Sequence, residues 1–173
     1  LANEQQTIKK SLTPKKQNGK KQDRPKADPN KVYDIPIGES IVLGNSDAKV
    51  TIIEWTDFQW PYCAKSVSLV ADILKKYPND VKVVIKNFPL SFHKQALKAA
   101  KYSLAANKQG KYKEMYYLIM ENYGKLKANE DLPLEYAKTL NLDINQFIAD
   151  MESDETAKQI ELEIKQLRES GIP

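Results

Sequence analysis

The sequence predicts an α/β fold in which a small sheet is followed by a larger helical part. Residues 50–85 have the order of apolar strand, amphipathic helix and β-branched strand, which is typical of a right-handed parallel crossover. The periodic segments after residue 92 have helical spacing, and all but one of the helices predicted there end near a glycine or an asparagine. The chain has 173 residues and is 41% hydrophobic, which is sufficient for one domain with its own core.

The first part of the chain, residues 1–31, is basic and poor in apolar side chains. It contains nine Lys or Arg and three Asp or Glu, a balance of +6, whereas the remainder has 18 and 20, a balance of −2. This composition cannot support a core and predicts a disordered tail or linker. A basic tail could contact anionic lipid or nucleic acid. A solvated tether explains the same composition, and we expect no nucleic-acid partner.

The folded domain is expected at residues 32–173 and begins with two strands. Apolar and polar residues alternate over 32–37, and Pro36 in this run indicates an edge strand. A turn is expected at 44–47. The next strand, Val50–Trp55, is apolar at nearly every position, as expected for a strand covered on both faces.

Helices account for most of the remaining residues. The first runs from Pro61 to about Tyr77, with apolar residues three and four apart on one face, and it ends before Pro78. A β-branched strand at 81–85 completes the strand-helix-strand unit. Further helices are expected at about 93–108, 111–123, 133–140, 143–151 and 153–170, the last two with N-caps Asp143 and Ser153.

The single cysteine, Cys63, lies at the start of the first helix. Pro61 fits the first helical position because its missing N–H would be unpaired there. Cys63 then falls in the first turn, near the positive end of the helix dipole, which lowers the pKa of a thiol, whereas burial raises it. One cysteine cannot form an internal disulfide, so dithiol oxidation and reduction cannot occur within this chain.

The residues around Cys63 resemble a known family. Phe58-Gln59-Trp60-Pro61-Tyr62-Cys63, followed by Ala64-Lys65-Ser66, is similar to the active-site region of DsbA-like thiol:disulfide oxidoreductases. The resemblance covers about residues 32–173 and includes Lys86-Asn87-Phe88-Pro89-Leu90, His93 and Gly171-Ile172-Pro173. It implies a thioredoxin-like core with an inserted helical domain. The strand-helix-strand half would span 32–90, the insertion about 91–151, and the helix at about 153–170 would return to the core.

The resemblance also implies roles for the residues near the cysteine. The family has Cys-Pro-Tyr-Cys or a close variant where this chain has Trp-Pro-Tyr-Cys. Trp60 therefore stands at the position of the attacking cysteine, and Cys63 at the position of the resolving one. Glu54 matches a buried acid that aids proton transfer in the family, or it is a strand-end glutamate that reaches water. His93 is either a general base for Cys63 or a structural histidine. The candidate site consists of Glu54, Trp60, Pro61, Tyr62, Cys63 and His93.

The resemblance implies more chain than this sequence contains. In the family, a glycine pair after the long helix is followed by a cis-proline loop, a β-hairpin and a closing helix. Pro173 comes a few residues too early to be that proline. The fold is therefore expected to be truncated before the hairpin and the last helix. Such a sheet would have an uncovered edge, through which the chain could associate with itself.

Three hypotheses for the function remain open. The first is thiol:disulfide exchange reduced to monothiol chemistry through Cys63, the second is a non-enzymatic module that binds peptide near Trp60, and the third is a degenerate copy. The resemblance implies unfolded or cysteine-containing protein substrates, a membrane redox partner and a periplasmic or extracytoplasmic location. The first residue, Leu1, indicates a processed precursor or a trimmed chain. One cysteine and one histidine are too few for a metal site, and no cofactor is expected.

Overall fold

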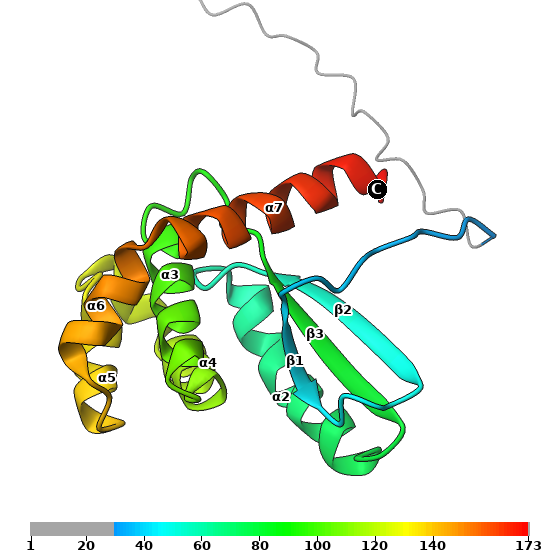
Figure 1. Ribbon diagram of the computed structural model, residues 1–173, viewed down its shortest axis with the longest axis horizontal. Helices are drawn as coiled ribbons and strands as arrows, with labels where there is room; N and C mark the ends of the chain where they lie inside the picture. Colours follow the sequence, from blue (N-terminus) through cyan, green and yellow to red (C-terminus); the bar gives the residue numbers. More distant parts are fainter. Residues whose placement is uncertain (1–29, 173) are drawn as a thin grey trace, which may run out of the picture. The chain divides into compact units, whose positions relative to one another are not determined.

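A three-stranded sheet forms the centre of one part of the protein (Figure 1). In the computed structural model, which describes residues 30–172, the strands are β1 (Ile41–Gly44), β2 (Val50–Thr56) and β3 (Val81–Asn87), in the order β1-β3-β2. β3 pairs antiparallel with β1 and parallel with β2. The parallel pair confirms the crossover that the sequence predicts, and its helix is α2 (Pro61–Lys76). Most of the predicted tail and Pro173 lie outside the described residues.

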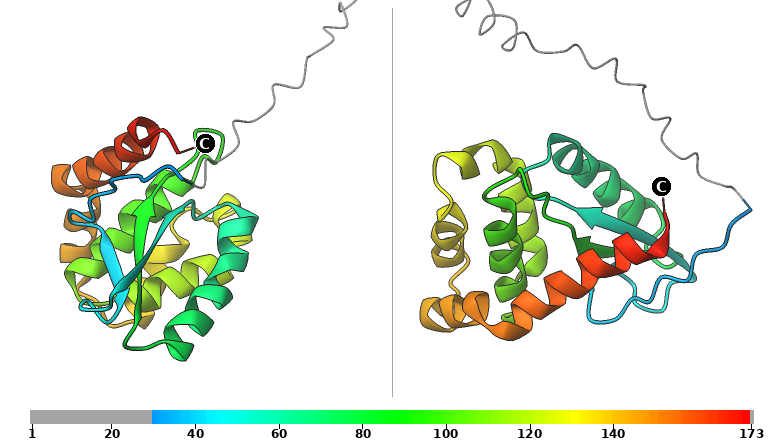
Figure 2. Two further views of the ribbon diagram at one scale, coloured as in Figure 1. Left: turned by 90° about the vertical axis from the view of Figure 1, so that its right-hand side faces the viewer. Right: turned by 90° about the horizontal axis from the view of Figure 1, so that it is seen from above.

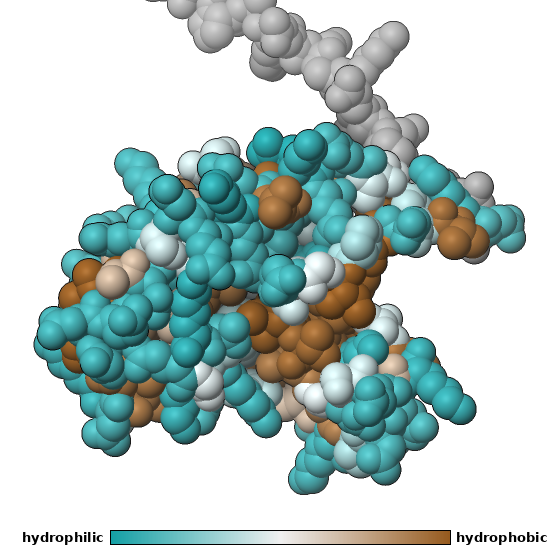
Figure 3. Space-filling model, in the orientation of Figure 1, coloured by the Kyte–Doolittle hydropathy of each residue, from teal (hydrophilic) through white to brown (hydrophobic). Residues whose placement is uncertain are grey.

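The two faces of the sheet are covered differently. α2 packs on one face, and the final helix, α7 (Asp154–Ser170), crosses the other face (Figure 2). Side chains alternate between these faces along each strand. On the α2 side, the buried residues of the strands join the core with those of α2, namely Ile41, Leu43, Val83, Ile85, Cys63, Val67 and Val70. On the other side, apolar side chains remain visible over the sheet (Figure 3).

The expected edge strand at residues 32–37 is wrong. This segment is not a strand, and the outer strand next to β3 on this side of the sheet is β1, four residues long and further along the chain. The carbonyls of Pro36 and Ile37 accept hydrogen bonds from Lys86 Nζ at 2.9 and 3.0 Å instead of from a neighbouring strand. β1 is too short for its alternation of two buried and two exposed residues to stand out in the sequence.

The expectation that Val50–Trp55 is covered on both faces is also wrong. β2 is the outer strand of the sheet in the described part of the chain, and its first three residues are exposed. Val50 is 52% exposed and Ile52 is 36% exposed. An apolar strand therefore lies at an edge, where the sequence pattern alone indicates an internal position.

The helices agree closely with the sequence. They are α3 (Ala96–Lys108), α4 (Tyr112–Glu121), a 3-10 turn η1 (Tyr123–Lys127), α5 (Leu132–Thr139), α6 (Ile144–Glu152) and α7. The predicted caps are confirmed, because Asp143 accepts a hydrogen bond from the Gln146 N–H and Ser153 from the Thr156 N–H. Gly171 ends α7 with a left-handed φ of +69°. α3 begins three residues later than predicted, after a loop at 88–95, and α4 ends at Glu121, two residues earlier than predicted, where the unpredicted turn η1 follows.

The helical part and the sheet share one core. The cluster of buried apolar residues runs without interruption from the sheet to residues of α3 to α7, such as Tyr116 and Phe147. The rings of Tyr102 and Phe147 stack, with their centroids 5.5 Å apart, and join α3 to α6. None of the helices in the described residues is long and apolar enough to cross a membrane.

Candidate functional site

Cys63 lies in the first turn of α2, beneath the turn that connects this helix to β2. α2 begins at Pro61 after Trp60, whose side chain does not cap the helix. The Asp57 N–H donates to Cys63 Sγ at 3.5 Å, so the thiol points back toward the end of β2. Cys63 is only 6% exposed and belongs to the core cluster. The thiol is therefore shielded from solvent, as expected for the resolving position of the motif.

The surroundings of Cys63 keep it protonated. Burial raises the pKa of the thiol above its ordinary value of 9.0, although the hydrogen bond from the Asp57 N–H acts in the opposite direction. The carboxylates of Glu54 and Asp57 raise the pKa further, because a thiolate next to them would be repelled. A protonated and buried thiol is a poor nucleophile. The environment thus opposes the activation expected from the helix N-terminus.

Glu54 lies next to α2 rather than in open solvent. Ser66 Oγ is 2.6 Å from Glu54 Oε1 and 2.8 Å from the Cys63 carbonyl oxygen. Burial raises the pKa of Glu54 above its ordinary value, although the Ser66 hydroxyl partly offsets this rise. A hydroxyl has one hydrogen and can donate to only one of these oxygens at a time. A protonated Glu54 would donate to Ser66 and allow both contacts, in agreement with the raised pKa.

A buried carboxylate, Asp57, holds the two loops of the site together. Its Oδ1 accepts from the Gln59 N–H at 2.7 Å, and its Oδ2 accepts from the Leu90 N–H at 2.7 Å. Because a carboxylate only accepts, His93 Nδ1 must donate to the same Oδ2, at 2.9 Å. His93 therefore binds Asp57, and no hydrogen bond joins His93 to Cys63 in the described residues.

A second contact joins the same loops beside Asp57. Gln59 Nε2 donates to Gln95 Oε1 at 2.9 Å, and the Gln95 N–H donates to Gln59 Oε1 at 2.7 Å. This reciprocal pair fixes the 57–60 turn against the 88–95 loop. The side chains that these two loops present to solvent therefore have a defined spacing.

Three aromatic side chains of these loops and of the first turn of α2 are exposed to solvent. Tyr62 is 69% exposed and Phe92 is 71% exposed, and Trp60 is also exposed. The rings of Trp60 and Tyr62 meet edge to face at 5.7 Å, and those of Phe92 and His93 at 4.6 Å. Lys65 Nζ lies 5.6 Å from the centre of the Tyr62 ring. We call the surface made by Trp60, Tyr62 and Phe92 the aromatic surface.

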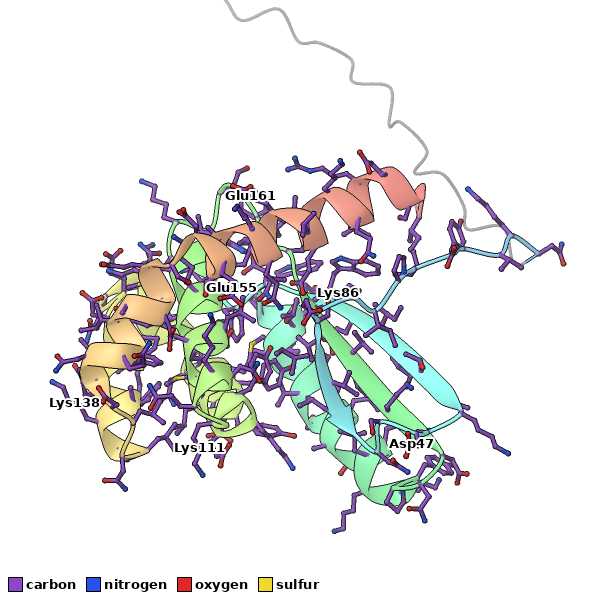
Figure 4. The ribbon with its side chains drawn as sticks, in the orientation of Figure 1. Asp47, Lys86, Lys111, Lys138, Glu155 and Glu161 are labelled. Atoms are coloured by element: carbon purple, nitrogen blue, oxygen red, sulfur yellow. The ribbon has the colours of Figure 1, made fainter. Side chains whose placement is uncertain are left out.

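A second buried carboxylate, Glu163 of α7, connects segments that are far apart in the sequence. It accepts from Ser40 Oγ at 2.7 Å, from the Asn87 N–H at 2.5 Å and from Asn87 Nδ2 at 2.8 Å. Lys86 Nζ donates to Ser40 Oγ at 2.8 Å, so Ser40 links the ammonium group to the carboxylate. Figure 4 shows Lys86 where α7 crosses the sheet. The Trp55 indole N–H donates to the Glu163 carbonyl oxygen and adds β2 to this connection.

A wide cleft in the described residues lies away from the cysteine. It has a volume of about 800 Å3 and lies between α7 and residues 34–40, with Lys86 and Glu163 among its lining residues. Neither Cys63 nor Trp60 lines it. The polar groups of Lys86 and Glu163 already have partners, whereas Gln166 Oε1, in the same lining, is buried without a hydrogen-bond partner. We therefore place the candidate site at the turn that carries Cys63.

The structure brings the predicted residues into one region but changes their relations. Cys63, Glu54 and His93 all lie around the end of β2, yet His93 is held by Asp57. The sequence analysis missed Asp57, Gln59 and Gln95. An aspartate directly after an apolar strand was the signal for the first, whereas nothing in the sequence pairs the two glutamines. No cluster of three or more His, Cys, Asp or Glu suited to a metal ion occurs in the described residues.

Comparisons with known families and structures agree with this fold. The family model described as thioredoxin matches residues 37–173. A thioredoxin-like oxidoreductase from Silicibacter pomeroyi DSS-3 is 30% identical, with a TM-score of 0.66 over 75% of this chain and 72% of that chain. Wolbachia pipientis alpha-DsbA1 is 20% identical, with a TM-score of 0.69 over 80% and 73%. BdbD from Bacillus subtilis is 22% identical, with a TM-score of 0.67 over 80% of both chains. The last two, below 25% identity, support the fold alone.

Curated relatives share only a segment with this chain. Na(+)/H(+) antiporter NhaA 1 of Salinispora arenicola (strain CNS-205) is 36% identical over 107 residues, which are 61% of this chain and 16% of the antiporter. Na(+)/H(+) antiporter NhaA of Herminiimonas arsenicoxydans is 29% identical over 147 residues, 84% of this chain and 23% of the antiporter. The chain thus spans less than a quarter of the length of these relatives, and their ion transport is not carried over to it.

Proposed function

The chain belongs to the thioredoxin family, with DsbA-like proteins as its structural relatives, and on this premise we propose that it binds unfolded protein segments at the aromatic surface. In this proposal Cys63 is a structural thiol, and neither dithiol nor monothiol exchange is the activity of the chain. The single cysteine excludes a dithiol cycle within these 173 residues.

The observation that carries the proposal is the difference in solvent exposure between Cys63 and its neighbours Trp60 and Tyr62 at the start of α2. Cys63 is 6% exposed with a raised pKa, whereas Trp60 and Tyr62 lie beside it and are open to solvent. In exchange chemistry the attacking sulfur must be accessible and ionised. Tyrosine and tryptophan at a surface are strong anchors for a bound polypeptide. Trp60, at the position of the family's attacking cysteine, thus offers a side chain that can bind a polypeptide but cannot act as a nucleophile.

The surface also favours a class of ligand. Exposed aromatic rings at a fixed spacing suit extended segments with apolar side chains, which unfolded proteins expose. Lys65 next to Tyr62 and Lys94 next to His93 add positive charge at the rim. We therefore expect preference for segments that combine apolar and acidic residues. An extracytoplasmic location follows from the DsbA-like resemblance and belongs to the same proposal. Self-association would use a different surface, the outer edge of β2.

Binding to a permanently unfolded protein tests the proposal. Fluorescence anisotropy of a labelled, reduced and carboxymethylated protein should show saturable binding. Trp60→Ala and Phe92→Ala should each weaken binding by about 10-fold or more, since aromatic anchors contribute strongly. Leu162→Ala is the control, because Leu162 is an exposed apolar residue on α7, outside the aromatic surface. Cys63→Ala should leave binding unchanged. Equal binding by all four variants would contradict the proposal.

The rate of reaction with a chromogenic disulfide separates this proposal from monothiol exchange. Native Cys63 should react at least about 100 times more slowly than the same chain in denaturant, since the thiol is buried and protonated. A native rate equal to or above the unfolded rate would show an activated thiolate and replace binding with exchange as the function. Cooperative melting of the same sample would exclude a degenerate copy that does not fold.

A further inference from the structure

Another cleft of the described residues lies at the opposite end of α2 from Cys63. It has a volume of about 390 Å3, within the range of small-molecule sites. Its walls come from the end of β1 and the turn after it, the last two turns of α2 with Pro78, and the first two turns of α4. α2 packs against α4, and β1 is the strand that β3 separates from β2. The cleft therefore lies where the sheet meets the helical part (Figure 1).

The apolar part of the lining is held in place by the core. Leu74 of α2 and Tyr117 of α4 both pack against the core cluster. The Tyr117 ring also meets the buried Tyr116 ring edge to face, with the centroids 5.6 Å apart. At the end of β1, Gly44 has a φ of +94°, and a Cβ there would lie 2.7 Å from Leu74 Cδ2. Glycine at this position thus lets α2 approach β1 closely and gives the cleft a defined apolar wall.

The polar side chains that line the cleft offer hydrogen-bond donors and no carboxylate. Lys75 and Lys113 contribute ammonium groups, and Tyr117 contributes a hydroxyl that keeps its hydrogen because burial raises its pKa. These three groups have no hydrogen-bond or ion-pair partner among the described residues. Asn45 Oδ1 accepts from the Asp47 N–H at 3.0 Å, which leaves the NH2 group of Asn45 available. A set of donors without a counter-charge favours an anionic ligand.

Lys113 is placed unfavourably for its own helix. It is the second residue of α4, where the positive end of the helix dipole repels a cation. The neighbouring Lys111 is offset by Glu114, with 2.7 Å between Nζ and Oε1, whereas Lys113 has no such partner in the described part of the chain. Lys75, in contrast, lies in the last turn of α2, where a cation is favourable. Residues that break a local rule are expected at functional sites, and an anion would supply the charge that Lys113 lacks.

We propose that this cleft binds a small organic anion, namely a carboxylate with an apolar body. The carboxylate accepts hydrogen bonds from Lys75 and Lys113, and the apolar body packs on Leu74 and Pro78. Inorganic phosphate meets the same ammonium groups but leaves the apolar wall uncovered, so it binds more weakly. The cleft and the aromatic surface lie at opposite ends of α2, and the proposal does not depend on the binding of unfolded segments.

Titration of the full 173-residue chain with phenylacetate, followed by the NMR shifts of the backbone amides, tests the proposal. We expect a dissociation constant on the order of 1 mM, typical of a ligand of this size. The largest shifts should occur at residues 44–45, 74–78 and 113–117. Phenylacetamide has the same apolar body without the charge, and it should bind at least about 5-fold more weakly, as should inorganic phosphate. Equal binding of the acid and either of these probes, or shifts centred on the aromatic surface, would overturn the proposal.

Substitution of single lysines tests the two ammonium groups. Lys75→Gln and Lys113→Gln should each weaken the binding of phenylacetate by about 5-fold, the upper range for an exposed charge pair. Lys76→Gln is the matched control, because Lys76 is an exposed neighbour that lies over the Tyr77 ring and does not line the cleft. Trp60→Ala, in the aromatic surface, should also bind like the parent. Unchanged binding in both cleft variants, or an equal loss in Lys76→Gln, would assign the affinity to general positive charge and overturn the site.

Discussion

Asp57 and Glu163 are both buried carboxylates without a direct lysine or arginine partner among the described residues, but they hold different parts of the protein. Each accepts hydrogen bonds from backbone N–H groups or polar side chains near the ends of β2 and β3. The donors to Asp57 come from the two loops beside Cys63. The donors to Glu163 come from the segment before β1 and from β3. Glu163 therefore attaches the last helix to the sheet, whereas Asp57 shapes the surface of the site.

Because of this difference, we expect Glu163 to contribute mainly to the stability of the fold and Asp57 mainly to binding at the aromatic surface. Loss of the Glu163 carboxylate should weaken the whole fold, because it connects α7 to Ser40 and Asn87 and lies close to the buried Lys86 ammonium. Loss of the Asp57 carboxylate should release mainly two loops. The first should appear in unfolding experiments, and the second chiefly in binding experiments.

The largest expected effect is that of Glu163→Leu on stability. The substitution leaves the Asn87 N–H without its acceptor and the buried Lys86 without a counter-charge. It should lower the free energy of unfolding by about 3–5 kcal/mol, measured by chemical denaturation. Glu161→Leu is the matched control, since Glu161 is an exposed acid on the same helix, visible in Figure 4. Equal losses for the two variants would show that Glu163 does not anchor α7.

Asp57→Ala should have a smaller effect on stability and a larger one on binding. It leaves the Gln59 and Leu90 N–H groups unpaired, which should cost about 2–3 kcal/mol in unfolding free energy. The loops that carry Trp60 and Phe92 lose their common anchor, and binding of an unfolded protein should weaken by about 10-fold. Asp72→Ala, an exposed acid of α2, should change neither quantity. Unchanged binding in a folded Asp57→Ala variant would separate the carboxylate from the surface.

The sequence allowed the prediction of the parts that rest on local patterns. The helix caps Asp143 and Ser153 and the parallel pair of strands follow from propensity and periodicity, and the structure confirms them. The errors concern relations that depend on distant contacts. The 32–37 segment has a strand-like alternation, but the Lys86 ammonium binds its carbonyls. β2 has the composition of a strand covered on both faces, but its first three residues are exposed in the part of the chain that the structure describes.

The candidate site shows the same division. Cys63 at a helix start beside Trp60 follows from the motif, and burial of the thiol agrees with the resolving position. The connection of His93 to Asp57 was not predicted, because 36 residues separate them and a single histidine carries no pattern. Gln59 and Gln95 are equally distant and become partners only after the loops have folded.

Loss of the Gln59–Gln95 pair should lower the free energy of unfolding by on the order of 1 kcal/mol, less than the loss of either buried carboxylate. Gln59→Ala removes both reciprocal bonds and Gln95→Ala removes the one between the side chains, so the double variant should be little worse than Gln59→Ala alone. The coupling energy from the four unfolding free energies measures this directly. Binding should weaken in all three variants. Additive losses would mean that the two amides act separately and that the loops are held by Asp57 alone.

The smallest expected effect concerns Glu54 and its dependence on pH. Burial raises the pKa of Glu54 in the folded chain above the ordinary 4.5, so the unfolded chain loses this proton first as pH rises. The folded state then binds more protons, and the contribution of Glu54 to the unfolding free energy falls between 4.5 and the raised pKa. Glu54→Gln should abolish that loss. It should be neutral at about pH 4 and stabilising by on the order of 0.5 kcal/mol at about pH 7.5, a small value because the side chain is only half-buried. Urea denaturation at the two pH values measures the difference.

Ser66→Ala should enlarge the pH dependence, since it removes the hydroxyl that lowers the pKa of Glu54. An effect of Glu54→Gln that is equal at both pH values would mean that the pKa of Glu54 is the same in the folded and the unfolded chain, and would contradict a pKa raised by burial.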